Sequence, residues 1–185
     1  MFVLIGLLVV LGIYIAATYN GLVTLRERVR NAWAQVDVQL KRRYDLIPNL
    51  VNTVKGYAKH ERETFQRITE ARSRAMASSD PGSRAEAESE LTRTIRSLFA
   101  VAENYPQLKA DANFRHLQEE LTQTESKIAY ARQFYNDTVQ KYNIRLKVFP
   151  VVLFARSLGF EEEKFFNLET TPLERENVNV SFDEE

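Results

Sequence analysis

The first 25 residues contain no charged side chain, and this feature constrains the fold more than any other. Residues 2–17 read FVLIGLLVVLGIYIAA. At about 1.5 Å per residue, a helix over all 25 uncharged residues exceeds the roughly 30 Å of hydrocarbon in a bilayer. A cleaved signal peptide would carry basic residues before the apolar run, but none is present, and Ala16-Ala17 make a poor cleavage site. The sequence therefore predicts a transmembrane helix over residues 1–20.

Basic residues flank this span on one side only. Arg26, Arg28 and Arg30 follow it closely, and no Lys or Arg precedes it. Cytoplasmic flanks carry the excess of basic residues in membrane proteins. We therefore expect a single-pass protein with its N-terminus outside and the rest of the chain in the cytoplasm.

After the span, apolar residues recur at steps of three and four, which is typical of an amphipathic helix. This stripe consists of Leu22, Leu25, Val29, Trp33, Val36, Leu40, Tyr44, Ile47, Val51, Val54 and Ala58. Pro48 interrupts it, and a proline inside a helix removes a backbone hydrogen bond and crowds the preceding turn. We expect a kink or a break near Asp45. The pattern then resumes and stops at a turn over residues 78–82, where Asp80 is a suitable N-cap and Pro81 a suitable first helical residue.

Two further helical runs follow this turn. The first extends from Ala87 to Tyr105, and the second from Phe114 to Phe149 has coiled-coil spacing over about five heptads. Sustained alternation of apolar and polar residues, the mark of a strand, is absent from the sequence. Long helices joined by short turns must bury their apolar stripes on one another. The predicted fold is all-α, with an antiparallel long-helix bundle over residues 21–160.

Past Pro150, the sequence predicts a short apolar helix over residues 151–160, with Gly159 as its C-cap. Residues 161–185 hold nine acidic residues against two basic ones, and we expect a mostly disordered tail. The apolar residues of this region form a candidate interaction segment: Val151, Val152, Leu153, Phe154, Leu158, Phe160, Phe165 and Phe166.

Three destinations are open for this segment, because so many apolar side chains are costly to leave in water. They are the end of its own bundle, a neighbouring subunit and the membrane surface. A helix lying on a membrane usually carries several Lys or Arg residues. Arg156 is the only one within residues 151–160, and an acidic stretch follows. This composition disfavours the membrane surface.

Metal and catalytic sites find little support in the sequence. The chain has no cysteine and only six glycines, without a phosphate-binding loop. His60 and His116 each precede a glutamate by three residues, the reverse of the Glu-x-x-His order of helical metal sites, and both lie off the apolar stripes. We predict no catalytic, cofactor-binding or metal-binding residue, and hence no enzyme.

Two other groups of residues have a structural and a functional interpretation. Residues 41–43 (KRR) could bind nucleic acid or lipid, but three basic residues on a helix more often form a solvated face. Tyr130, Phe134, Tyr135 and Tyr142 could line a ligand pocket. At helical spacing such residues more often form the bundle core, with hydroxyls at its rim. We expect the structural interpretation in both cases, and no nucleic acid as a partner.

Residues 32–61 (AWAQVDVQLKRRYDLIPNLVNTVKGYAKHE) and 114–143 (FRHLQEELTQTESKIAYARQFYNDTVQKYN) resemble the LemA family of bacterial membrane proteins. The N-terminal span, the Phe149-Pro150 pair and the ending Leu158-Gly159-Phe160 add to the resemblance. It implies an inner-membrane protein with an antiparallel helical-bundle domain. It implies no catalytic residues, because the family is largely uncharacterised.

The sequence is best interpreted as a non-enzymatic helical scaffold, anchored in the membrane and assembling with copies of itself or with other membrane proteins. A regular apolar stripe on a membrane anchor favours this hypothesis. An accessory or regulatory partner of a membrane enzyme, such as a protease in envelope stress, is an alternative. A sensor that binds a small ligand in its bundle core is another.

Overall fold

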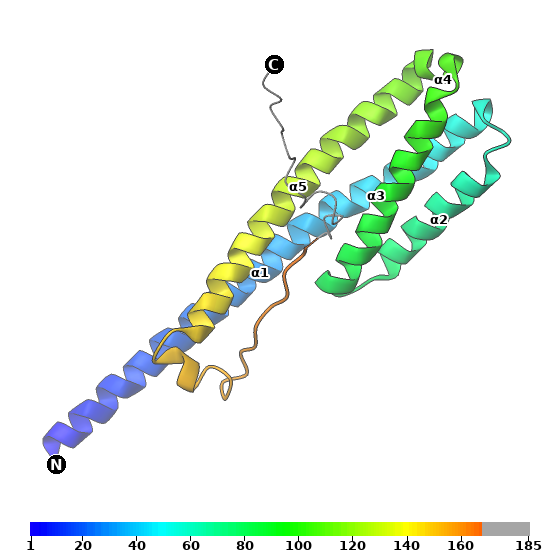
Figure 1. Cartoon of the computed structure of the whole chain (residues 1–185). Coiled ribbons are helices and arrows are strands. Elements are labelled where there is room, and N and C mark those ends of the chain that lie inside the picture. The colour runs from blue at the N-terminus through cyan, green and yellow to red at the C-terminus, as the bar shows by residue number, and fades with distance from the viewer. Residues whose placement is uncertain (168–185) are drawn as a thin grey trace, which may run out of the picture.

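A computed structural model describes residues 1–167, and its regular structure is entirely helical in that range (Figure 1). The elements are α1 (Phe2–Tyr57), α2 (Arg62–Ala77), α3 (Pro81–Glu103), α4 (Pro106–Ala110), α5 (Ala112–Lys147) and the short 3-10 helix η1 (Val151–Leu153). The all-α prediction, with an apolar N-terminal helix leading into a bundle of long helices, is confirmed.

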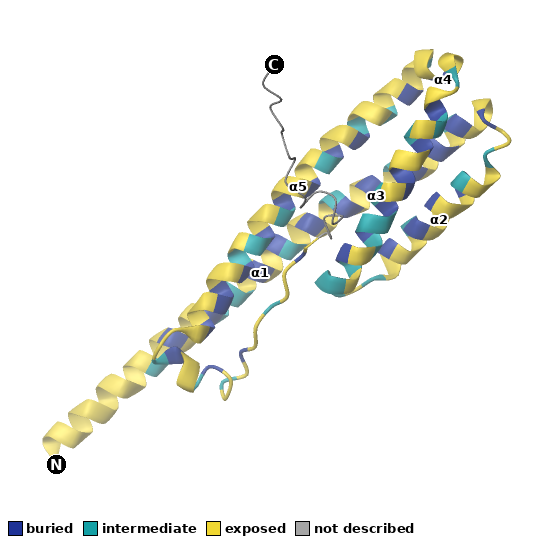
Figure 2. Ribbon diagram, viewed as in Figure 1, coloured by how far each residue is buried: buried dark blue, intermediate teal, exposed yellow. Residues whose placement is uncertain are grey.

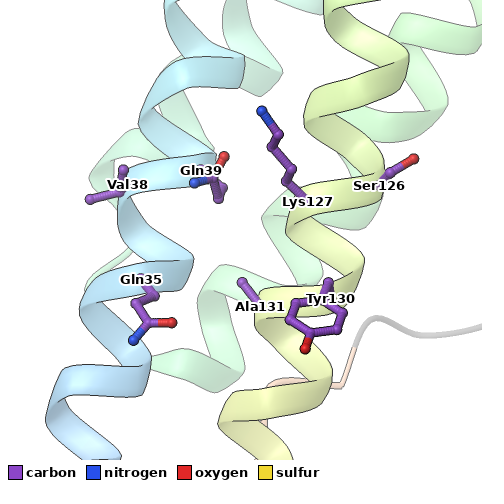
Figure 3. Close-up of a pocket in the computed structure, with 7 residues that line it drawn as sticks. All are labelled: Gln35, Val38, Gln39, Ser126, Lys127, Tyr130 and Ala131. Carbon is purple, nitrogen blue, oxygen red and sulfur yellow. The ribbon is translucent and has the colours of Figure 1, made fainter.

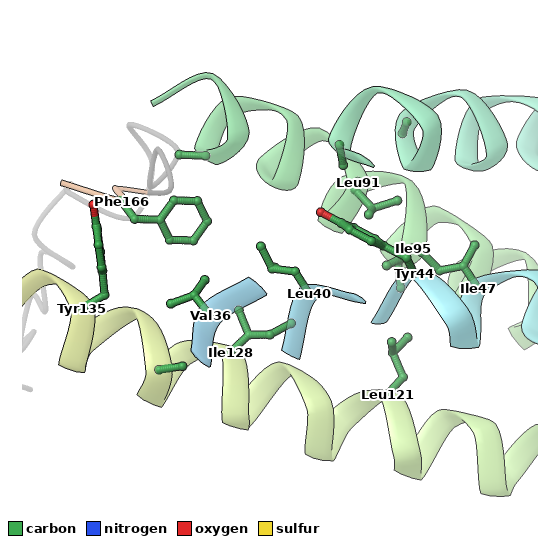
Figure 4. Close-up of a cluster of buried hydrophobic side chains, with 14 of the residues drawn as sticks. Val36, Leu40, Tyr44, Ile47, Leu91, Ile95, Leu121, Ile128, Tyr135 and Phe166 are labelled. Atoms are coloured by element: carbon green, nitrogen blue, oxygen red, sulfur yellow. The ribbon is translucent and has the colours of Figure 1, made fainter. Parts of the chain in front are cut away.

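The longest elements, α1 and α5, form an antiparallel pair along the whole bundle (Figure 1). Arg42 of α1 contacts Glu120 of α5 at 3.2 Å, and Tyr57 at the end of α1 donates a hydrogen bond to Asp111 before α5 at 2.9 Å. The facing stripes bury the side chains that Figure 4 labels on these helices: Val36, Leu40, Tyr44, Ile47, Leu121, Ile128 and Tyr135. The apolar stripes predicted for these two helices therefore do meet in the core.

A hairpin formed by α2 and α3 packs beside the C-terminal half of α1 (Figures 1 and 2). The turn between them was predicted correctly, because its chemistry is local. The carboxylate of Asp80 accepts hydrogen bonds from the backbone N–H groups of Gly82 and Ser83 at 3.1 and 3.3 Å, and Pro81 is the first residue of α3. Hydrogen bonds from the Ser83 hydroxyl and backbone lower the pKa of Asp80 and hold the cap in its charged form.

Of the kink or break predicted near Asp45, the break is wrong, because α1 continues through Pro48 without interruption to Tyr57. Pro48 is exposed, while Ile47, Leu50 and Val51 beside it are buried. Packing on both sides of the proline therefore holds the helix together. The interruption instead comes after Tyr57, where a turn leads into α2.

The prediction of a helix over residues 151–160 holds only in part. One 3-10 turn, Val151–Leu153, is followed by further turns, and Gly159 has a φ of 78° that favours glycine. The N–H groups of Phe160 and Gly159 donate to the carbonyls of Ala155 and Arg156, at 3.1 Å each, as in a Schellman C-cap. Gly159 therefore takes the predicted capping role at the end of a shorter, tighter element.

Residues 161–167, which were assigned to the acidic tail, run back along the bundle in an extended form. The remaining part of the predicted tail, residues 168–185, lies outside the described residues, so its disorder stays a prediction.

Candidate functional site

Residues 1–17 project beyond the bundle, and nearly all of them are exposed (Figure 2). Large apolar side chains such as Leu4, Leu7 and Val10 have nothing packed against them. Within the described residues, α1 alone is long and apolar enough to cross a membrane. Burial begins at Ile15 and Thr18, so the bundle starts close to the predicted end of the span.

The three basic residues after the span differ in their surroundings. Arg28 and Arg30 are exposed, and Arg30 bonds to Glu27 at 2.7 Å. Arg26 is half-buried, and its guanidinium lies 5.1 Å from the ring centroid of Phe160. Two of the predicted membrane-flanking residues therefore face outward, while Arg26 also contacts the C-terminal segment.

The candidate interaction segment is divided between the bundle and the surface. Val151, Phe160 and Phe166 are buried, and Phe154 and Leu158 are half-buried against the core. Leu153, Val152 and Phe165 remain exposed. The end of the bundle thus covers one side of the segment, and none of the described residues covers the exposed side chains.

Two asparagines of α5 hold the extended residues 161–167 against the bundle. The side-chain amide of Asn143 donates to the carbonyl of Glu163 and accepts from its N–H, at 2.9 Å each. Asn136 makes the same pair of bonds with Phe166, at 3.2 and 2.9 Å. Seven residues of a helix and three residues of an extended chain both span about 10 Å. The distance from Asn136 to Asn143 along α5 therefore matches the distance from Phe166 to Glu163 along the extended stretch. Sequence reasoning missed these contacts, because the spacing of the two asparagines places them on one face of α5 but does not indicate what they bind.

An aromatic cluster anchors the same stretch. The ring centroid of Trp33 lies 5.1 Å from that of Tyr135 and 5.4 Å from that of Phe166. Burial, together with the carboxylate of Glu163, raises the pKa of Tyr135 to about 12. The hydroxyl therefore stays protonated and donates to the carbonyl of Lys164 at 2.8 Å.

A charged cluster lies inside the bundle, where α1, α3 and α5 meet. Arg43 is only 1 % exposed and forms an ion pair with Glu88, which is equally buried. Its guanidinium also contacts Glu125 at 2.8 Å and donates to the Thr92 hydroxyl at 3.2 Å. Tyr44 donates to Glu88, and burial raises the pKa of this tyrosine despite the nearby arginines.

The expectation that residues 41–43 form a solvated face is therefore wrong for Arg43, although Lys41 and Arg42 are exposed. The sequence carries a signal for its burial, since Arg43 follows Val36 by seven residues and shares its face of the helix.

Pro48 has a specific consequence beside this cluster. A proline has no N–H, so it cannot donate to the carbonyl four residues earlier, that of Tyr44. The side chain of Arg72 in α2 donates to this carbonyl instead, with Nε at 2.7 Å. Pro48 thus leaves the carbonyl of Tyr44 free to accept the hydrogen bond from Arg72, which links the α2–α3 hairpin to α1.

An open groove lies between α1 and α5 on the side that faces away from α3 (Figure 3). Its volume is about 450 Å³, and it is lined by Gln35, Val38, Gln39, Ser126, Lys127, Tyr130 and Ala131. Tyr130 is 77 % exposed, and Val38 and Phe134 are exposed beside it. The prediction that Tyr130 and Phe134 belong to the core is wrong, because each precedes a core position by one residue and so points outward. Tyr135 and Tyr142 are buried as predicted.

The two histidines are exposed, as expected from their position off the stripes. Within residues 1–167, no group of three or more His, Asp or Glu side chains is placed to hold a metal ion.

Comparison with known proteins connects this architecture to a family. The chain is 24 % identical to the magnetosome protein MamQ 2 of Paramagnetospirillum magneticum and 22 % identical to MamQ of Magnetospirillum gryphiswaldense, and each alignment covers 80 % of this chain. The chain spans 64 % of the length of these relatives. It is 25 % identical to the protein LemA of Metamycoplasma hominis, over 88 % of this chain and 74 % of that protein. The sequence profile of the LemA family matches residues 32–182, and the chain belongs to this family.

Proposed function

We propose that the chain is a non-enzymatic scaffold, anchored in the bacterial inner membrane by α1, that assembles with copies of itself through the groove between α1 and α5. The observation that carries this proposal is the exposure of the apolar side chains of Val38 and Tyr130, which line the groove, together with Phe134 one helical turn further along α5. Exposed apolar patches of this kind mark interaction surfaces on soluble domains.

The position of the groove supports self-assembly. It faces away from α3, so the hairpin does not cover it (Figure 3). Gln39 adds a polar group there, since its side-chain oxygen is buried and has no hydrogen-bond partner among the described residues. A side chain entering from a second copy can donate to this oxygen.

Membrane anchoring is supported by the long, unpacked N-terminal part of α1, which is apolar enough to cross a membrane. We propose a single pass with the bundle in the cytoplasm, because the basic flank lies after the span. The chain has no cysteine, so one introduced at Ser79, in the exposed turn between α2 and α3, is a unique label. It should resist an impermeant thiol reagent in intact cells and react after lysis. Labelling in intact spheroplasts would reverse the topology.

Self-assembly is tested by the molar mass of the full-length protein in mild detergent, measured by light scattering. We expect a homo-oligomer, and we expect Val38→Glu with Tyr130→Glu to reduce it to monomers without loss of helical content, because two charges would be buried in the contact. Met76→Glu is the matched control, since Met76 is a similarly exposed apolar residue of α2. A monomer at all concentrations would contradict self-assembly and favour an accessory that needs another protein.

A further inference from the structure

The turn that follows α5 exposes apolar side chains at the end of the bundle nearest the membrane span (Figures 1 and 2). Phe149 is 80 % exposed and Leu153 is 73 % exposed, with Val152 half-exposed between them. Val151 is buried in the core and fixes the turn to the bundle. The exposed side chains are therefore held in place by the fold and are not part of a loose end.

The level of this turn along α1 follows from the antiparallel packing. The rings of Trp33 and Tyr135 pack against each other, so they lie at the same level. α5 ends at Lys147, twelve residues after Tyr135. Because the two helices are antiparallel, the residue of α1 at the level of Lys147 lies twelve residues before Trp33, at Gly21. Beyond that level, the ring of Tyr19 packs 5.5 Å from that of Phe160. The turn therefore lies beside residues 18–21 of α1.

The end of the membrane span predicted over residues 1–20 falls at the same level. A helix needs about 20 residues to cross roughly 30 Å of hydrocarbon, and 20 residues counted from Phe2 end at Gly21. The exposed side chains after Lys147 therefore lie at this level or on the side of it toward the membrane span. We infer that the turn formed by residues 148–153 inserts Phe149, Val152 and Leu153 into the bilayer beside the span, as a second contact of the same chain with lipid.

Basic residues lie where such an insertion needs them. Arg145 and Lys147 occupy the last turn of α5, and both are exposed, as is Arg156 after η1. Arg28 of α1, after the predicted span, is also exposed. Anionic headgroups attract basic side chains at this depth. The sequence disfavoured the membrane surface because residues 151–160 hold a single arginine and an acidic stretch follows them. The fold adds basic residues from α1 and α5 to the same level. Glu162 also lies here and pairs with Lys147 at 2.7 Å.

A second contact restricts how the molecule sits on the membrane. A single spanning helix can tilt and rotate, whereas an inserted turn beside it fixes which side of the bundle faces the lipid. The inference rests on the proposed membrane span and does not depend on self-assembly.

The test places an environment-sensitive nitrobenzoxadiazole fluorophore on single cysteines in the full-length protein. The positions are Phe149→Cys and Leu153→Cys in the turn, Leu8→Cys in the span and His116→Cys near the start of α5. Each variant is reconstituted in phosphatidylcholine–phosphatidylglycerol liposomes, with and without lipids that carry a nitroxide quencher on the acyl chain. Circular dichroism confirms that each variant keeps its helical content.

We expect both turn labels and the span label to show blue-shifted emission and to lose intensity with the quencher lipids, while the label at position 116 shows neither effect. Water-like emission from both turn labels would overturn the inference. Blue-shifted emission without quenching would also overturn it, because the turn would then be covered by protein, such as a second copy. Failure of the Leu8→Cys label to be quenched would instead contradict the membrane span itself.

Discussion

Arg43 occupies a position of the α1 stripe that the heptad pattern reserves for the core, seven residues after Val36. A lone arginine there would be costly to bury, but the carboxylates of Glu88 and Glu125 compensate its charge from α3 and α5. Because the ion pairs join three helices, they can form only when the hairpin and the α1–α5 pair are in register. The ion pairs of Arg43 therefore depend on the relative positions of α1, α3 and α5.

Removal of Arg43 alone should be strongly destabilising. Arg43→Met leaves Glu88 buried without its partner, and we expect a loss of about 3 to 5 kcal/mol in the free energy of unfolding. Adding Glu88→Gln should recover most of this loss, because the neutral amide can still accept the Tyr44 hydrogen bond. Urea unfolding followed by the fluorescence of Trp33, the only tryptophan, gives the measurement.

The matched control is Arg42→Met, because Arg42 is the exposed neighbour that pairs with Glu120 at the surface. Its cost should stay below about 1 kcal/mol. Equal costs for the two single variants would contradict the assignment of Arg43 to a buried pair.

At the scale of the elements, Pro48 shows how a local rule can be correct while its expected consequence is wrong. Pro48 lacks the N–H that an interior helical residue would donate, as predicted. The helix nevertheless continues through Pro48 to Tyr57. The freed carbonyl of Tyr44 is instead occupied by Arg72, an interaction that depends on where α2 packs. No pattern within α1 could have indicated this partner.

A double-mutant cycle tests this role of the proline. Arg72→Ala should cost about 1 to 2 kcal/mol in the natural sequence, since the carbonyl of Tyr44 loses its charged donor. In a Pro48→Ala background the cost should be smaller, because the N–H of the new alanine can bond to the same carbonyl. The same fluorescence-monitored unfolding supplies all four values. If Arg72→Ala costs the same in both backgrounds, the proline does not act through this carbonyl.

The comparison of sequence and structure separates local from long-range information. The Asp80-Pro81 turn and the apolar stripes were predicted correctly, since capping groups and helical periodicity lie within one stretch of sequence. The extended path of residues 161–167 was not, because Asn136 and Asn143 become binding partners only once the chain has turned back after α5. Tyr130 and Phe134 were misplaced by a shift of one residue, which in a helix moves a side chain about 100° around the axis. The groove between α1 and α5 therefore escaped notice.

At the scale of the whole molecule, α1 contains both the proposed membrane span and a main element of the bundle. Its 56 residues extend about 84 Å without interruption, and roughly 30 Å of this length is needed for the hydrocarbon. The helix is uninterrupted between the two parts, so the proposed anchor would continue directly into the bundle. If copies assemble through the groove as proposed, a continuous helix of this kind would hold their membrane spans at a fixed spacing.

The most direct measurement is electron cryomicroscopy of the full-length protein reconstituted in liposomes. The scaffold hypothesis predicts clusters with a regular spacing on the membrane, formed by bundles that contact one another through the α1–α5 groove. The Val38→Glu, Tyr130→Glu variant, with unchanged helical content, should be dispersed as single bundles at the same protein density. Single, separate bundles of the unmodified protein on the membrane would contradict the scaffold hypothesis.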